Sequence, residues 1–348
     1  MTSPEKESYP FFAAWREGIR RVGRAPAVLI GVWAMTMAVS VPLALAVRDA
    51  IQTHLGNSLA ADAAASGVND DWMQEFGADA TGLATTFKPA VVGFGAVLDN
   101  LSAFLDNDRR PIVIIAATAV YLALWIFLAG GIIDRFARDR ATGAHGFFAA
   151  CGVFFFRFLR LGLLMAAAYG FIFRYLHPWL FDTVYPGLTH DVTVERTAFM
   201  IRLALYGVFA LVVGACNLLF DYAKVRAVVE DRRSMIGATL AAFRFIRRNP
   251  SAISLYLADL ALFLIVLALY AVVAPGAGGA GWSMWIAFAV GQAYVIGRLW
   301  VKLVFWAGEA ALFQARLAHA GYVAAPKPVW PDSPMAEALS SPSTPALP

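Results

Sequence analysis

The 348-residue chain has few charged residues and few of the residue types that build metal and redox sites. Charged residues make up 15% of it, and it contains two cysteines, Cys151 and Cys216, and five scattered histidines. A disulfide framework or a zinc site needs several cysteines or histidines at characteristic spacings. The sequence therefore predicts no disulfide, no metal site and no bound cofactor.

Patterns typical of catalytic sites are missing as well. The glycine-rich stretch from Gly276 to Gly281 reads as an uncharged hairpin turn and not as a phosphate-cradling loop. Asp70, Asp71 and Glu75 lack a partner histidine or a metal-ligand pattern, so a solvated acidic loop is a better interpretation than a carboxylate-based active site. We therefore expect that the protein is not an enzyme.

The chain instead has an excess of apolar residues, collected into long runs. Apolar residues make up 60% of the sequence and the mean hydropathy is +0.63. A helix needs about 20 apolar residues to cross roughly 30 Å of hydrocarbon. The runs predict an all-α, polytopic integral membrane protein with about six transmembrane helices, near Pro26–Val47, Pro111–Ile133, Phe158–His177, Ala198–Phe220, Ala252–Ala274 and Trp282–Trp306.

Basic and non-basic connections alternate between these runs. Residues 1–25 contain five Lys and Arg, whereas 48–110 carries nine acids against four bases. The connections after the second and fourth runs are again rich in arginine, while 178–197 has only Arg196 and 275–281 has no charge. Because positively charged loops stay inside, we expect a multi-pass protein of the bacterial cytoplasmic (inner) membrane with both termini in the cytoplasm.

The stretch Thr81–Leu105 is apolar enough to compete as a further span. Counting it as one would reverse every later span and break the alternation of charge. We therefore expect a helix that lies on the outer surface or dips into it. The net charge of +4 is expected to face anionic lipid head groups, and no nucleic-acid partner is predicted.

Three short segments resemble one another in sequence and in position. Phe11–Arg16 (FFAAWR), Phe147–Gly152 (FFAACG) and Thr239–Arg244 (TLAAFR) precede the first, third and fifth runs, and each continues into an aromatic and arginine-rich stretch. Asp139 and Asp231 also align at the same offset. A helix with aromatic residues on one side and arginines on the other lies in the head-group plane. We predict three repeats of an interfacial elbow helix followed by a transmembrane hairpin; chance similarity in a biased sequence is the alternative.

This elbow-and-hairpin pattern, with aromatic–Ala–Ala ahead of basic residues, resembles uncharacterised bacterial six-span membrane protein families. It is also similar to the membrane domain sometimes fused to glycerophosphodiester phosphodiesterases. The likeness covers about residues 10–320. No phosphodiesterase domain is present, so the resemblance implies a membrane domain and transfers no catalytic residue.

An acidic residue stands at the cytoplasmic end of each even-numbered run: Asp134, Asp221 and Glu309. A carboxylate there opposes the helix dipole, which favours cations at a helix C-terminus. Each should therefore be paired, and an arginine of an elbow helix is the expected partner. We predict that these pairs are cytoplasmic clamps that fix the elbows to the spans; a ring of ion pairs that closes a gate is the alternative.

Two ionisable residues, Asp259 and Arg298, lie well inside the fifth and sixth runs. Charges at such depth cost several kcal/mol unless they are paired or hydrated. Both residues lie about equally far from Gly278, near the centre of the hairpin. We therefore predict an intramembrane ion pair between Asp259 and Arg298, with Lys302 one turn further inward.

The predicted organisation has three parts. Residues 1–25 form a cytoplasmic segment with an interfacial helix, 26–322 form the membrane domain with 48–110 as its extracytoplasmic segment, and 323–348 form a disordered tail rich in Pro, Ala and Ser. We expect a membrane scaffold or a lipid-interacting protein, with membrane lipids as partners and a protein partner or a homo-oligomer as further options. A transporter of small solutes or lipids that uses a cavity between the hairpins is the alternative.

Overall fold

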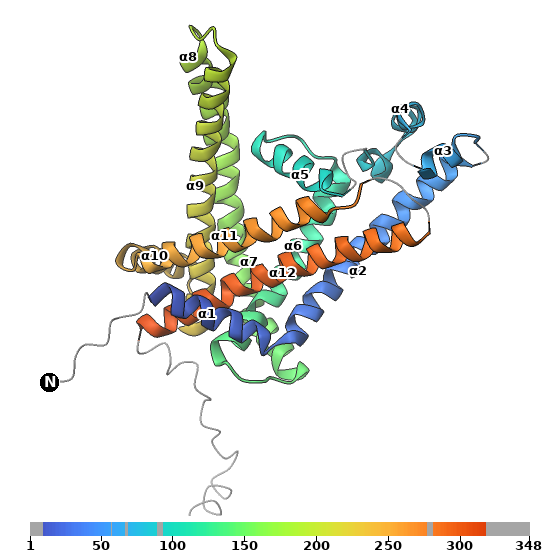
Figure 1. Cartoon of the computed structure of the whole chain (residues 1–348). Coiled ribbons are helices and arrows are strands. Elements are labelled where there is room, and N and C mark those ends of the chain that lie inside the picture. Colours follow the sequence, from blue (N-terminus) through green and yellow to red (C-terminus); the bar gives the residue numbers. More distant parts are fainter. Residues whose placement is uncertain (1–9, 57, 67–68, 89–92, 277–280, 318–348) are drawn as a thin grey trace, which may run out of the picture.

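The structure is a computed structural model that describes residues 10–56, 58–66, 69–88, 93–276 and 281–317 (Figure 1). Within these ranges the chain forms helices joined by short connections and contains no strand. The all-α class predicted from the sequence is thus confirmed. The predicted disordered tail lies outside the described residues.

Within the described residues, six helical stretches are long and apolar enough to cross a membrane, as predicted. The third, Ala144–Thr189, joins α7 (Ala144–Phe171) through two π-helical turns to α8 (Tyr185–Thr189). At 1.5 Å per residue it is about 69 Å long, more than twice the roughly 30 Å of a hydrocarbon core. The other five stretches are α2 (Pro26–Leu55), α6 (Ile112–Arg138), α9 (Glu195–Val229), α11 (Ser251–Val273) and α12 (Trp282–Arg316).

Shorter helices lie at both ends of the bundle. Two of them, α1 (Pro10–Gly23) and α10 (Met235–Arg248), precede α2 and α11 at predicted elbow positions. The second predicted elbow, Phe147–Gly152, is not a separate helix, because it forms part of α7 and runs on into the third span. The connection from α2 to α6 contains α3 (Ala61–Ser66), α4 (Asp70–Asp79), the 3-10 helix η1 (Gly82–Thr86) and α5 (Gly95–Leu105).

The apolar helix α5 does not form a span. Its 11 residues extend about 16 Å, which is too short to cross a membrane. The Phe94 ring, just before α5, lies 6.2 Å from the Tyr270 ring near the end of α11. The expectation that this region adds no seventh span therefore agrees with the six stretches found.

The main hydrophobic core lies where the C-terminal ends of α6, α9 and α12 meet α1 and α10; we call this part the basic end. Away from it, α7–α9 stand as a column while α2, α11 and α12 lean away (Figure 1). Apolar side chains on the diverging parts are exposed, for example Leu211 and Val272. Packing at the basic end therefore holds the helices together. The fully buried side chains there include Ile132, Ile133, Phe136, Tyr222, Leu303, Leu312 and Phe313.

Glycines permit very close packing at two of these contacts. A Cβ atom on Gly18 of α1 would lie 2.7 Å from the backbone nitrogen of Gly308 in α12. A Cβ atom on Gly131 of α6 would lie 2.5 Å from the Cys151 sulfur and 2.8 Å from the Phe147 carbonyl oxygen of α7. Real Cβ atoms do not approach so closely, so α1 on α12 and α7 on α6 both require glycine at these positions.

The third predicted elbow, α10, packs on α9. The Phe245 ring lies 5.2 Å from the Tyr222 ring, and Arg226 donates a hydrogen bond of 2.6 Å to the Ala241 carbonyl oxygen. Each predicted elbow segment thus contacts the last span of the preceding predicted repeat, with α1 contacting α12. A cyclic threefold repeat would require such an arrangement, and the repeat itself stays a prediction.

Candidate functional site

Two aspartates just beyond the second and fourth spans hold elbow segments in place. Asp139 Oδ2 lies 3.3 Å from Arg20 Nη2 and 3.3 Å from Arg24 Nη1 of α1. Asp231 Oδ1 lies 2.5 Å from Arg157 Nη1 of α7. Both aspartates have left-handed backbones, with φ of 46° and 51°, a conformation that Asp tolerates better than most residues. The alignment of the repeats paired these two residues but did not predict that they hold the elbows.

The three acids predicted to hold the elbows do not do so. Asp134 pairs with Arg138 at 2.8 Å, within α6, and Asp221 pairs with Lys224 at 2.6 Å, within α9. Cations one turn further along the same helix are in reach without any tertiary contact. Glu309 is 1% exposed, and neither carboxylate oxygen has a hydrogen-bond partner among the described residues.

The predicted Asp259–Arg298 ion pair is also not formed. Asp259 is fully buried, and neither of its carboxylate oxygens has a hydrogen-bond partner in the described part of the chain. Arg298 is exposed. Equal depth along two antiparallel helices does not fix which way each side chain points, and here the two residues face different surroundings.

The depth estimate was wrong as well. The Tyr270 and Tyr294 rings stack with centroids 4.1 Å apart, which fixes how α11 and α12 lie along each other. Asp259 comes eleven residues before Tyr270, so it is level with the position eleven residues after Tyr294. That position is about 10 Å beyond Arg298 along α12. The sequence prediction compared how many residues separate Asp259 and Arg298 from Gly278 in the turn, and this comparison does not reveal the offset between the two helices.

Three helices instead bring a group of ionisable side chains together at the basic end. Asp221, Tyr222 and Lys224 come from α9, Asp259 comes from α11 and Glu309 comes from α12; we call these five residues the junction cluster. Asp221, Asp259 and Lys224 are the charged neighbours of Glu309, and Tyr222 faces all three carboxyl groups. A fourth helix, α1, covers the cluster. Sequence reasoning found the individual acids but not their convergence.

Tryptophan rings border the junction cluster on the side of α6 and α12. The Lys224 and Lys302 amines lie 5.4 and 5.5 Å from the centre of the Trp306 ring, and Lys302 lies 3.7 Å from that of Trp125. The Trp306 indole N–H donates a 3.3 Å hydrogen bond to Asp221. Such cation–π contacts stabilise ammonium groups away from water.

Two cations of α12, Lys302 and Arg298, differ in their surroundings. They are one helical turn apart; Arg298 is exposed, whereas the Lys302 amine lies against the Trp125 and Trp306 rings. Neither belongs to an ion pair that the structure records among the described residues. Within the described part of the chain, Arg298 therefore offers a free cation at this face of α12.

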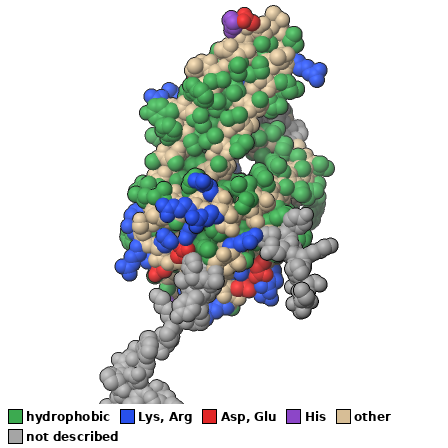
Figure 2. All heavy atoms as spheres, turned by 90° about the vertical axis from the view of Figure 1, so that its left-hand side faces the viewer, with side chains coloured by type: hydrophobic (Ala, Val, Ile, Leu, Met, Phe, Trp, Pro, Cys, Tyr) green, Lys and Arg blue, Asp and Glu red, His purple; other side chains and the backbone are tan. Residues whose placement is uncertain are grey.

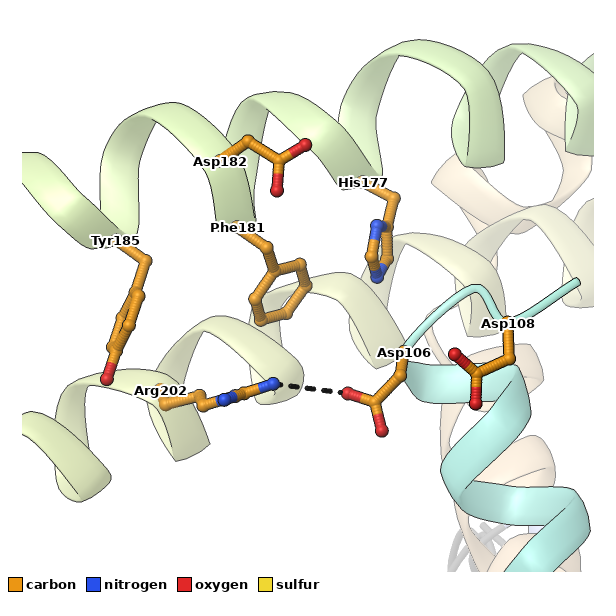
Figure 3. Close-up of a pocket in the computed structure, with 7 residues that line it drawn as sticks. All are labelled: Asp106, Asp108, His177, Phe181, Asp182, Tyr185 and Arg202. Atoms are coloured by element: carbon orange, nitrogen blue, oxygen red, sulfur yellow. Dashed lines mark hydrogen bonds and ion pairs between the residues drawn. The ribbon is translucent and has the colours of Figure 1, made fainter.

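A second candidate site is a cavity of about 390 Å³ at the opposite end of the molecule (Figure 3). It lies between α7–α8, α9 and the loop after α5. Arg202 points toward Asp106, with 3.3 Å between Nη2 and Oδ1 (Figure 3). The Tyr206 hydroxyl donates a hydrogen bond to Asp106 and holds the pKa of that carboxyl below its usual range, and Ser102 and Arg202 act in the same direction.

The remaining lining of this cavity is acidic and aromatic. Asp108 and Asp182 carry carboxylates, while the half-buried Phe181 and Tyr185 form an apolar wall. His177 is buried, with its Nε2 2.8 Å from the Leu105 carbonyl oxygen. Among the described residues, no group of three or more His, Cys, Asp or Glu is arranged to hold a metal ion. The cavity thus has polar contacts but lacks a metal-binding geometry.

The surface of the basic end is rich in arginine (Figure 2). Within α1, partial burial alone would raise the pKa of Glu17. Hydrogen bonds from Arg20 and Arg21 more than offset this effect, so that this pKa lies below its usual value. The exposed arginines of α1, the connection after it and α10 are Arg16, Arg20, Arg24, Arg244, Arg247 and Arg248.

Comparison of the chain with protein-family models, with curated proteins and with solved structures found no match. The features with functional potential are therefore the arginine-rich surface, the junction cluster and the exposed Arg298 of α12. None of these combines a nucleophile, a general base and an oxyanion-binding group. Their chemistry suits the binding of anions, lipids or protons.

Proposed function

We propose that the protein is a lipid-interacting integral membrane protein that binds anionic phospholipid at its basic end. The observation that carries this proposal is the surface of α10. Ile236, Leu240 and Phe243 are 64%, 54% and 50% exposed and follow one another along one strip of the helix. The exposed Arg247 continues this strip, with its guanidinium over the Phe243 ring, and the exposed Arg244 lies beside it. Apolar side chains next to arginines suit a helix that rests between acyl chains and anionic head groups.

The same combination recurs on α1. Phe12 is 50% exposed, and Arg16 and Arg20 follow it at intervals of one turn. A row of cations near an anionic leaflet contributes about 1 kcal/mol per residue to membrane binding. The exposed Arg298 extends this positive surface along α12.

In this proposal the basic end faces the cytoplasm of a bacterial inner membrane. The alternation of charge between connections supports this orientation, because basic segments are retained inside. The long acidic connection between α2 and α6 then lies outside. The protein acts as a scaffold that gathers anionic lipid, and a protein partner or a second copy of the chain remains compatible with it.

Transport of a small solute or lipid is the second candidate. The buried carboxyl groups of Asp259 and Glu309, which lack partners among the described residues, are unusual for a purely structural role. The interior around them is densely packed with apolar side chains. The cavity of about 390 Å³ lies at the other end, so lipid binding at the surface is the better-supported function.

The proposal is tested by thermal unfolding of the purified protein in detergent, with added phosphatidylglycerol or phosphatidylcholine. A ligand that binds only the folded state raises its stability as ligand concentration rises above Kd. We expect a larger rise in Tm with phosphatidylglycerol. The triple variant Arg244→Gln, Arg247→Gln, Arg248→Gln should lose most of this difference.

A matched triple variant at the opposite end serves as control. Arg109, Arg174 and Arg196 are exposed, and their replacement by glutamine removes the same charge. This variant should respond to phosphatidylglycerol as the wild-type protein does. An equal response of the wild-type protein to both lipids, or an equal loss in both triple variants, contradicts a specific lipid site at the basic end.

A further inference from the structure

Buried polar groups without partners concentrate around the junction cluster. Among the described residues they include the Tyr222 hydroxyl and both carboxylate oxygens of Glu309. The Trp15 indole faces Asp259, but this contact falls short of hydrogen-bond geometry, so the Trp15 nitrogen and the Asp259 carboxylate are also left unsatisfied within these residues. The exposed fractions of Tyr222, Asp259 and Glu309 are 0%, 0% and 1%. Buried polar groups in native proteins nearly always have a partner. So many together indicate that a small polar species or additional protons belong here.

The charges of the junction cluster do not balance. Asp221, Asp259 and Glu309 supply three carboxyl groups, and Lys224 supplies one ammonium group, which already lies 2.6 Å from Asp221. Asp259 and Glu309 are therefore left without a cation. An ionised carboxylate is very costly to bury unpaired, and two neighbouring carboxylates do not readily ionise together.

Among the residues that the structure describes, the surroundings of these two carboxyl groups offer no further compensating charge. Asp259 faces the Trp15 indole of α1. Glu309 faces Asp221, Lys224 and Asp259. The other titratable groups that interact with Asp221, Asp259 or Glu309 are Tyr222, Tyr256, Tyr169 and Lys302. Among these acids, Tyr169 and Lys302 interact with Asp221 only.

We propose that Asp259, Glu309 and the Tyr222 hydroxyl form a buried proton-binding site, in which at least one of the two carboxyl groups carries a proton at neutral pH. A proton removes the charge that makes burial of Asp259 or Glu309 costly, and the Trp15 N–H faces Asp259. No covalent bond between heavy atoms forms or breaks, since only a proton moves.

Asp221 and Lys224 are the least buried members of the junction cluster. Lys224 is half-buried, Asp221 is 5% exposed, and both are charged neighbours of Glu309. Lipid binding by surface arginines does not require such a site, so this inference goes beyond the proposed function. It supplies the feature that an ion-coupled carrier would need.

Infrared spectroscopy tests the proposal, because a protonated carboxyl has a carbonyl stretching band that a carboxylate lacks. The spectra of the full-length protein, Glu309→Gln and Asp259→Asn would be compared at about pH 7, near the middle of the range in which free carboxyls are fully ionised. We expect the wild-type protein to show this band and at least one of the two variants to lose it. Glu195→Gln, at the exposed start of α9, is the matched control and should leave the band unchanged.

Two results would overturn the proposal. The first is a wild-type spectrum that equals those of both variants in the carbonyl region, since the acids would then be ionised. The second is a rise in wild-type Tm with sodium chloride, relative to choline chloride, that Glu309→Gln abolishes, because a metal cation would then fill the site. If one variant fails to fold, the other variant and the salt comparison decide.

Discussion

Gly18 of α1 and Gly308 of α12 lie in direct backbone contact, so that a Cβ atom on Gly18 would stand 2.7 Å from the Gly308 nitrogen. The contact seats α1 against the last span and above the junction cluster. It fixes the distance at which Trp15, one turn earlier in α1, approaches Asp259. The position of α1 at the basic end therefore requires glycine at residue 18, whereas a Cβ atom on Gly308 would make only ordinary contacts.

Gly18→Ala is expected to lower the free energy of unfolding by about 1–3 kcal/mol, as overpacking of a close contact does. Gly23→Ala is the matched control in the same helix, because nothing lies within 4 Å of its Cβ position. Replacing glycine with alanine in a helix is otherwise stabilising by about 0.5–1 kcal/mol. Thermal unfolding in detergent measures both, and equal Tm values for the two variants would contradict the close contact.

Asp259→Asn and Arg298→Gln should act independently. The two side chains face different surroundings, and a double-mutant cycle of separated residues is additive within about 0.3–0.5 kcal/mol. Measuring unfolding of the wild type, both single variants and the double variant gives the coupling energy. A coupling well above 1 kcal/mol would restore the ion pair predicted from the sequence and contradict the observed arrangement.

Two substitutions of Asp139 should separate the effect of its charge on stability from the effect of its backbone conformation. Its carboxylate lies 3.3 Å from both Arg20 and Arg24, and partly exposed ion pairs contribute about 0.2–1 kcal/mol each. Asp139→Asn removes the charge but tolerates the φ of 46°, whereas Asp139→Ala also introduces backbone strain of about 1 kcal/mol. We expect Asp139→Ala to have the lower Tm; the reverse order would exclude the strained conformation.

The cavity lined by Asp106 and Arg202 should make stability depend on acid pH through Asp106. Its pKa is lowered in the folded state, chiefly by the hydrogen bond from Tyr206. A group with a lowered pKa stabilises the fold above its unfolded pKa, about 3.9 for Asp, and this stabilisation disappears as pH falls through the folded value. Tm should therefore fall more steeply with acidification in the wild type than in Tyr206→Phe. Parallel profiles would show that Tyr206 does not set this pKa.

Orientation can be measured with single cysteines. Ser58 lies in the acidic connection between α2 and α6, and Arg233 lies between α9 and α10; both are exposed. We expect a membrane-impermeant thiol reagent to label Ser58→Cys when it is applied to cells whose outer membrane has been removed and whose inner membrane is intact. Arg233→Cys should react only after permeabilisation, because basic segments stay inside. The opposite pattern would reverse the proposed orientation.

The spans could be predicted from the sequence because the thickness of the hydrocarbon sets the length of an apolar run. Contacts between side chains could not, as Asp259 and Arg298 illustrate. Their pairing depends on how far α11 slides along α12 and on the rotation of each helix, and these are set by distant contacts such as Tyr270 with Tyr294. Local hydropathy carries no information on either quantity.

The contacts of the elbow segments could be predicted in part. Asp139 and Asp231 occupied equivalent positions in the aligned segments, and the structure gives both a left-handed backbone and arginine partners. The sequence also contained Asp134, Asp221 and Glu309 at equivalent positions, which looked equally suited to bind the elbows. The sequence alone did not distinguish the two sets, because it did not show that Asp134 and Asp221 pair with cations of their own helices.

Native mass spectrometry of the protein released from membranes tests the central claim, lipid binding at the basic end, most directly. The account predicts that anionic phospholipid remains bound to the wild-type protein. Bound lipid should be depleted in the variant with Arg244, Arg247 and Arg248 replaced by glutamine, and retained when Arg109, Arg174 and Arg196 are replaced instead. A protein that carries no lipid, or that keeps the same lipids in all three forms, would contradict it.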